Sequence, residues 1–303
     1  MTASLLSGGK APVILDFDAS VPPVAVDEVR IDLAGWQEAI RFGCSMRVFA
    51  GLEDHLDRLM PQEYDCVFTG SGDYHHLSLL LLRRLARLRG LPPDSLDLVV
   101  CDNHPDNMRY LFGLHCGSWV RHASSLACVR RVHVIGITSP DIGLFRAWEN
   151  YLMPFVRKKL WYWSVGQSAN WLGLLGRGAH SRRFRTADAL IAAFTPVLGE
   201  TGAVYLSIDK DVLSPSAAYT GWDQGVCGPA HLEAVLRGCA GRLIGCDVTG
   251  DFSVYAYAGR FKRLLSRRDG LTGTLPDAPE SLRAERQAMN IRLLEMIREA
   301  TKM

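Results

Sequence analysis

Short apolar runs rich in valine and isoleucine recur along the chain, separated by stretches that are polar or contain glycine. Runs of this kind are typical of strands that are covered on both faces, because every side chain then meets apolar neighbours. They predict strands over residues 13–17, 65–69, 96–101, 132–137, 203–208 and 243–246.

Helical patterns lie between these runs. Residues 77–88 form one, residues 186–198 form another with Thr186 and Asp188 as capping candidates, and residues 231–237 follow a Gly-Pro pair that is a common helix entry. Alternation of strands and helices predicts the α/β class, with a central, mainly parallel sheet and helices on both faces.

The C-terminal part has a different pattern. Residues 269–279 are rich in glycine and proline and predict a linker, and residues 280–300 predict a charged amphipathic helix. We expect its apolar stripe to pack on the body of the protein or on a neighbouring subunit. The stripe consists of Met289, Leu293, Met296 and Ile297.

Residues 148–171 hold an unusual concentration of tryptophan and tyrosine around the basic residues 157–159. The favoured interpretation is a helical flap that packs on the sheet. A substrate lid, a subunit contact and a membrane-surface patch are the alternatives.

Composition narrows the class of protein. A chain of 303 residues with 48% hydrophobic residues can bury a full core, as one large domain or two small ones. A net charge of +2 gives no electrostatic case for nucleic acid. The 8 cysteines form no Cys-x-x-Cys pair, and no segment reads as a signal peptide or a membrane span. We therefore expect a reduced, cytoplasmic protein.

Candidate metal ligands follow three of the predicted strands. Asp102, His104 and Asp106 come directly after the run 96–101, and Asp209 and Asp211 follow the run 203–208. Residues 70–76 include the pair His75-His76. In open α/β sheets, sites form outside the carboxyl ends of the strands, so we expect these side chains to share one crevice. Carboxylate and imidazole ligands suit Mn²⁺, with Zn²⁺, Fe²⁺ or Co²⁺ as alternatives. The number of carboxylates favours two ions, a type of site that activates water for hydrolysis.

At these residues the chain resembles the ureohydrolase superfamily of arginase, agmatinase and formimidoylglutamase. Residues 72–75, 102–106 and 207–215 match three family motifs in order, the first with one inserted residue, and the matched span runs from about residue 70 to residue 251. The resemblance implies a single arginase-like domain over residues 1–303 with a three-layer α/β/α fold. It also implies a centre of two Mn²⁺ ions and a homo-oligomer.

The resemblance also implies roles for the ligands. His75 or His76 binds one ion together with Asp106, and His75 is preferred because the residues after it match those that follow the family's ligand. The non-ligand of the pair is expected to be a helix cap or a hydrogen-bond donor behind the ligands. The other ion is bound by His104 and Asp211, and both ions are bridged by Asp102 and Asp209.

Two further roles come from the same resemblance. His115 lies in a segment like the family's Leu-His-Gly and is the candidate proton shuttle, with His122 as a weaker alternative. An imidazole suits this role because its pKa lies near neutrality. Asp251 takes the place of the family's late glutamate and is expected to pair with the substrate cation, whereas Asp247 has a structural role.

The expected activity is hydrolysis of a C–N bond in a linear guanidino or amidino compound, by a hydroxide shared between the two ions. Residues 107–111 lack the polar pattern with which arginase binds free arginine, which favours another guanidino substrate, including an arginine side chain within a peptide. In the same stretch, Arg109 could meet a carboxylate, and Tyr219, Trp222 and Asp223 are expected to shape the pocket mouth. The alternatives are a one-metal deacetylase and a non-catalytic, metal-stabilised binding protein.

Overall fold

A parallel sheet forms the centre of the molecule in the computed structural model, which describes residues 9–259, 262 and 280–302. Within these residues the sheet has nine strands in the order β2-β1-β4-β11-β10-β5-β7-β8-β9, and every neighbouring pair is parallel. The predicted α/β class with a parallel central sheet is confirmed. The strands are β1 Val13–Asp16, β2 Val29–Asp32, β4 Val67–Gly70, β5 Leu96–Cys101, β7 Val129–Ile137, β8 Leu160–Val165, β9 Ser181–Phe184, β10 Ala203–Asp209 and β11 Leu243–Thr249.

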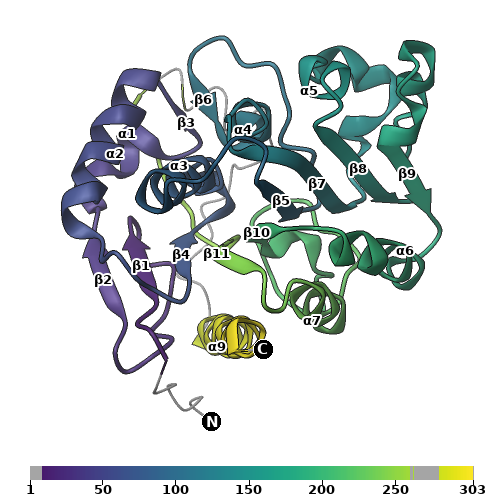
Figure 1. Ribbon diagram of the computed structural model, residues 1–303. Coiled ribbons are helices and arrows are strands. Elements are labelled where there is room, and N and C mark those ends of the chain that lie inside the picture. The colour runs from purple at the N-terminus through teal and green to yellow at the C-terminus, as the bar shows by residue number, and fades with distance from the viewer. Residues whose placement is uncertain (1–8, 260–261, 263–279, 303) are drawn as a thin grey trace.

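Helices cover both faces of this sheet, which completes the three layers (Figure 1). On one face α2, α3 and α4 pack their apolar side chains into one core, and on the other α6, α7 and α9 pack into a second. The helices are α1 Gln37–Ile40, α2 Met46–Leu59, α3 Leu77–Arg89, α4 Trp119–Ala123, α5 Met153–Val156, α6 Ala187–Gly199, α7 Pro229–Gly238 and α9 Glu280–Lys302. A separate antiparallel pair joins β3 Gly43–Cys44 to β6 Leu114–His115.

Local sequence signals set several of the boundaries. The Thr186 hydroxyl accepts a hydrogen bond of 3.2 Å from the Ala189 amide and caps α6, as predicted. Helix α3 ends where Gly90 adopts a left-handed backbone with φ of 55°, a conformation that glycine adopts at little cost.

The prediction of a helical flap over residues 148–171 is wrong in its central part. Strand β8 occupies Leu160–Val165 and pairs with β7 and β9 inside the sheet. The side chains of Tyr162 and Trp163 are almost fully buried, on opposite faces of the strand. Large aromatic side chains fit a pleated surface well, so the same residues that suggested a flap favour a strand.

Strands β2 and β9 and helix α2 were not predicted. β9 reads Ser-Arg-Arg-Phe and β2 alternates buried and exposed positions, so neither edge strand has the continuous apolar run of the central strands. Helix α2 has no long apolar run because it buries one face only.

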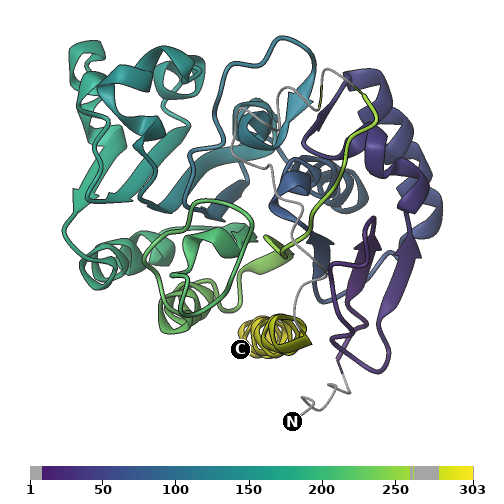
Figure 2. The ribbon, with the colours of Figure 1, turned by 180° about the vertical axis from the view of Figure 1, so that it is seen from behind.

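The C-terminal helix α9 lies on the same side of the sheet as α7 and contacts both α7 and β11 (Figure 2). The linker predicted at residues 269–279 lies outside the described residues. All eight cysteines are buried and none is part of a disulfide. Among the described helices, none combines the length and the apolar character that crossing a bilayer requires.

Candidate metal centre

The candidate ligands lie at one edge of the sheet, at the carboxyl ends of β4, β5 and β10. These strands are close together in the order β4-β11-β10-β5, and because they are parallel their carboxyl ends face the same way. His75 follows β4 through the 3₁₀ turn Gly72–Tyr74, and residues 102–106 follow β5 directly. Asp209 is the last residue of β10, and Asp211 lies in the 3₁₀ turn Lys210–Val212.

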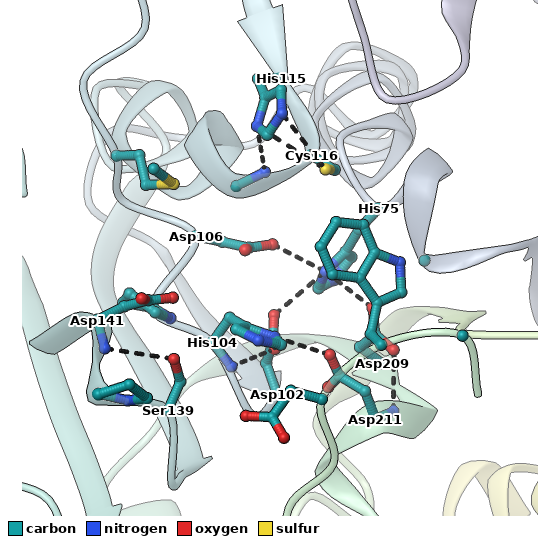
Figure 3. A pocket seen from close by; sticks show the side chains of 18 of the residues that line it. His75, Asp102, His104, Asp106, His115, Cys116, Ser139, Asp141, Asp209 and Asp211 are labelled. Atoms are coloured by element: carbon teal, nitrogen blue, oxygen red, sulfur yellow. Dashed lines mark hydrogen bonds and ion pairs between the residues drawn. The ribbon is translucent and has the colours of Figure 1, made fainter. Parts of the chain in front are cut away.

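The first group of ligands surrounds His75 (Figure 3). Its Nδ1 atom lies 2.9 Å from a carboxylate oxygen of Asp106, 3.2 Å from one of Asp102 and 3.5 Å from one of Asp209. All four residues are buried. The ligand atoms of His75, Asp102 and Asp209 are close enough to one another to hold a single cation.

The second group surrounds His104. Its Nδ1 atom lies 2.8 Å from Asp211 Oδ2 and 3.6 Å from Asp102 Oδ1. These three residues form a second cluster of suitable size for one cation. Asp102 belongs to both clusters and contributes Oδ2 to the first and Oδ1 to the second, so its carboxylate lies between two adjacent positions.

The hydrogen bonding of Asp102 fits a cation. Its Oδ2 atom is buried and makes no hydrogen bond of normal geometry within the described residues, although His75 Nδ1 is 3.2 Å away. A buried carboxylate oxygen without a partner costs free energy, and a bound cation would remove that cost.

The pKa values of the carboxyl groups point the same way. Burial and the charge of Asp102 raise the pKa of Asp106 to about 7 and that of Asp211 to about 6. Burial and the charge of Asp211 raise the pKa of Asp209 well above its usual value. Burial alone would also raise the pKa of Asp102, but its contacts with His104 and His75 lower it. The four carboxyl groups therefore have too little positive charge near them, and divalent cations would supply it.

Hydrogen bonds behind His75 fix the orientation of its ring. Asp247 Oδ1 accepts a hydrogen bond of 2.8 Å from the Ser207 hydroxyl, and His75 Nε2 lies 3.0 Å from the same hydroxyl oxygen. Because the Ser207 proton is directed at Asp247, the Ser207 oxygen accepts from Nε2–H. The lone pair of a neutral His75 is then on Nδ1, which faces the carboxylates. Asp247 thus has a supporting position behind the site.

His76 lies outside both ligand clusters and does not line the cavity. Its side chain is fully buried, and neither ring nitrogen makes a hydrogen bond of normal geometry within the described residues. Burial and the charge of His115 lower its pKa to about 3, so the ring is neutral at pH 7. Of the two histidines considered as ligands, only His75 belongs to a ligand cluster.

The backbone at Asp106 is strained. Its φ angle is 46°, a left-handed value that non-glycine residues seldom adopt. The turn aims the carboxylate back at His75, and Trp119 Nε1 donates a hydrogen bond of 2.8 Å to its Oδ2 atom. Strain of this kind is retained where the surrounding structure compensates for it, often at functional sites.

A cavity of about 480 Å³ opens above both clusters. His115 lines it on the opposite side from the clustered carboxylates (Figure 3). Its Nδ1 atom accepts a hydrogen bond of 3.0 Å from the Gly117 amide, so the proton of the neutral ring is on Nε2. Burial and the charge of Lys262 lower the pKa of His115 to about 4. His122 does not line the cavity, and its ring accepts a hydrogen bond from Arg121.

Sequence reasoning missed two charged residues of the cavity wall. Asp141 and Arg146 both line it and form an ion pair of 2.8 Å. Asp141 follows β7 as Asp102 follows β5, so the position of a carboxylate after an apolar run could have identified it. Trp222 and Asp223, which were expected at the pocket mouth, line the cavity, whereas Tyr219 does not.

Asp251 is not where its predicted role requires it to be. Its carboxylate is bound to Lys210 and Asn290 on the far side of the turn that carries Asp209, and it does not line the cavity. A carboxylate that is already paired and buried there is not available to a substrate cation in the cavity. Arg109 is also outside the cavity wall, with its Nε–H bonded to the Asn150 carbonyl.

Comparisons of sequence give a distant relative. No protein-family model matches the chain. An uncharacterized protein from Thermotoga maritima is 28% identical over 197 residues, which are 65% of this chain and 62% of that protein. The match therefore spans about three fifths of the length of this curated relative.

Solved structures are similar to this chain over more of its length. A hypothetical agmatinase from Burkholderia thailandensis is similar with a TM-score of 0.52 and 18% identity, over 96% of this chain and 86% of that one. The Trypanosoma cruzi formiminoglutamase, determined with Mn²⁺, has a TM-score of 0.51 and 14% identity, over 92% and 78%. The chain thus has the three-layer fold of ureohydrolase structures, and the resemblance seen in its motifs is confirmed at the level of the fold.

Proposed function

We propose that the protein is a metal-dependent hydrolase that cleaves a C–N bond of a linear guanidino or amidino substrate. The observation that supports this most strongly is the pair of ligand clusters that share Asp102 beneath one cavity. Two adjacent divalent cations supply activation of a water molecule and stabilisation of negative charge at the carbon under attack.

The residues that would hold the two cations are those of the clusters. His75, Asp102, Asp106 and Asp209 surround the first position, and His104 and Asp211 join Asp102 at the second. Oxygen and imidazole ligands without thiolates suit Mn²⁺, and the formiminoglutamase with this fold contains that metal. We propose that these residues would hold two Mn²⁺ ions.

The chain's own groups would bind the substrate and move its proton. The indole of Trp222 lies in the cavity wall, where it offers an aromatic face to a planar guanidinium cation. His115 lines the same wall and is our candidate for proton transfer to the leaving amine. Because its pKa of about 4 keeps the ring neutral, it would first have to take up the proton that the attacking water releases. Asp141, Arg146 and Asp223 are the charged residues available for the distant end of the substrate.

The second ligand cluster is also what argues against the alternatives. A deacetylase that uses one metal ion has no need of His104 and Asp211. These two residues lie beside the first cluster, with 2.8 Å between His104 Nδ1 and Asp211 Oδ2. A non-catalytic protein has no need of a cavity that gives access to both clusters. An oligomer in the cytoplasm is proposed from the same resemblance, and the exposed side chains of Phe145 and Trp148 provide apolar surface for a subunit contact.

The test is a substrate panel on protein loaded with Mn²⁺. The panel contains guanidino compounds ending in an amine, guanidino and formimidoyl amino acids, and peptides that contain arginine, with urea, ammonia and amide products measured. We expect one class to be hydrolysed, and Asp102→Asn to lower both the rate and the metal affinity by roughly 100-fold or more. Product release that survives Asp102→Asn and Asp209→Asn, or deacetylation with one zinc ion per chain, would contradict the proposal.

A further inference from the structure

Lys210 lies between two metal ligands but points away from them. Asp209 and Asp211 line the cavity, whereas Lys210 lines a small void on the other side of the turn together with Arg286 of α9. Its side chain is only 3% exposed. A buried ammonium group is costly unless it is paired and hydrogen-bonded, so the stability of this turn depends on the partners of Lys210.

Those partners come from two distant parts of the chain. The Lys210 ammonium group forms an ion pair with Asp251 and donates a hydrogen bond of 2.7 Å to Asn290 Oδ1. Asn290 Nδ2 in turn donates to Asp251 Oδ2 at 3.1 Å, which closes a triangle of buried polar groups. Asp251 is 2% exposed and Asn290 is fully buried. Through Asn290, the C-terminal helix α9 is joined to the turn that carries two candidate ligands.

The chain around Asp251 is held against the ligand turns as well. Gly250 has a φ angle of 93°, and a Cβ atom there would clash with Asp209 Oδ1 and lie 2.7 Å from the Lys210 amide nitrogen. The Asp251 amide donates a hydrogen bond of 2.9 Å to the carbonyl of Gly70, the last residue of β4. Asp251 therefore contacts both the end of β4, which leads to His75, and the end of β10.

We propose that Lys210, Asp251 and Asn290 form a positioning lock through which α9 fixes the turn that presents Asp209 and Asp211 to the metal ions. The inference rests on the metal centre of the proposed function and adds three positioning residues that do not touch the substrate. It also reassigns Asp251, because a carboxylate held by Lys210 and Asn290 acts on the ligand turn instead of on a substrate cation.

The experiment measures metal binding and stability separately from turnover. Metal-free protein is titrated with Mn²⁺ by calorimetry, and its thermal midpoint is recorded without metal. The variants are Lys210→Met, Asp251→Asn, and a triple change of Lys210→Met, Asp251→Leu and Asn290→Leu. Arg298→Met is the matched control, because Arg298 also belongs to α9 and forms an ion pair of 2.6 Å with Asp65 far from the site.

We expect Lys210→Met to weaken Mn²⁺ binding by about 10- to 100-fold, the range found when a group that supports metal ligands is lost. The triple variant replaces all the buried polar groups by apolar ones, which is often neutral or stabilising, so it should recover the midpoint but not the metal affinity. Arg298→Met should lower the midpoint and leave the metal affinity unchanged. If Lys210→Met does not fold, the triple variant carries the test.

Two results would overturn the lock. One is full Mn²⁺ affinity in the triple variant, which would make the triad purely structural. The other is Asp251→Asn protein with unchanged metal binding and a raised KM for guanidino compounds, which would return Asp251 to a substrate contact. Wild-type protein that binds two Mn²⁺ ions but hydrolyses nothing would refute the proposed function and leave the lock to be judged by metal affinity.

Discussion

The adjacent histidines His75 and His76 show how much a single position matters at the residue scale. His75 Nδ1 meets three carboxylates, and its other nitrogen is held by Ser207. His76 is buried without a hydrogen bond of normal geometry for either nitrogen within the described residues. The 3₁₀ turn Gly72–Tyr74 sets the direction of the chain just before the two histidines. It thereby determines that the side chain of His75 enters the site.

This contrast gives a prediction for the two positions. His75→Ala should abolish tight binding of one Mn²⁺ ion, because it removes the nitrogen around which three carboxylates gather. His76→Leu should leave metal binding unchanged and should not destabilise the protein, since a buried unsatisfied polar group costs about 1–3 kcal/mol. Metal content and thermal midpoint of both variants check this. Loss of one ion in His76→Leu and not in His75→Ala would reverse the assignment.

At the scale of elements, close approach between turns shapes the cavity wall. Gly72 begins the turn after β4, and a Cβ atom there would lie 2.9 Å from Trp222 Cδ1 and 3.4 Å from Asp209 Oδ2. Trp222 itself stacks on Phe42 at 6.3 Å between ring centres and meets the His104 ring edge-on at 6.0 Å. The loop that carries Trp222 therefore packs directly on the β4 turn, and the absence of a side chain at Gly72 makes room for the indole.

Gly72→Ala is expected to displace the Trp222 indole and to raise the KM for the substrate several-fold, with a loss of about 1–3 kcal/mol in unfolding free energy from overpacking. The measurements are steady-state kinetics and denaturant unfolding. Gly173→Ala is the matched control, because a Cβ atom at Gly173 meets nothing within 4 Å. An unchanged KM in Gly72→Ala would show that Trp222 does not contact the substrate.

For the whole molecule, the pKa values of the centre couple metal binding to stability. The pKa of Asp106 is raised to about 7 and that of Asp211 to about 6, from an ordinary value of 3.8. Burial alone would lower the pKa of His75 and His104, but their carboxylate partners raise both well above 6.5. In the folded, metal-free protein these four groups thus bind more protons near pH 6–7 than they do in the unfolded chain.

The sign of the resulting pH dependence follows from linkage. A raised pKa stabilises the folded state at low pH, and this contribution is lost as pH rises through the folded-state pKa values. The contribution of the centre to the stability of the metal-free protein should therefore fall between about pH 5 and pH 8, whereas buried histidines with lowered pKa values, such as His76 and His115, act in the opposite direction. Because Mn²⁺ displaces the same protons, the stabilisation by metal should increase over that range. Thermal midpoints with and without Mn²⁺ at several pH values test this, and a difference between the two midpoints that shrinks towards pH 8 would contradict it.

Much of the architecture could be predicted from the sequence because it depends on local pattern. The central strands β5 and β10 are continuous apolar runs, and each is followed by alternating carboxylates. Parallel strands place their carboxyl ends at one edge, so the pattern along the chain is enough to bring Asp102 and Asp209 together. The edge strand β9 and the aromatic strand β8 lack that local signal, because their state depends on which neighbours they pair with.

The apolar runs and the residues at their ends were enough to predict the fold class and the acidic and imidazole side chains that meet in the centre. The choice between His75 and His76, the position of Asp141 and Arg146 in the cavity wall, and the contact of Asp251 with Lys210 and Asn290 became visible in three dimensions. These outcomes depend on the direction of single side chains and on contacts between distant segments, as between Lys210 and Asn290, 80 residues apart, or between His75 and Ser207, 132 residues apart. No pattern along the chain encodes such contacts, because they arise when the packed layers bring distant turns together.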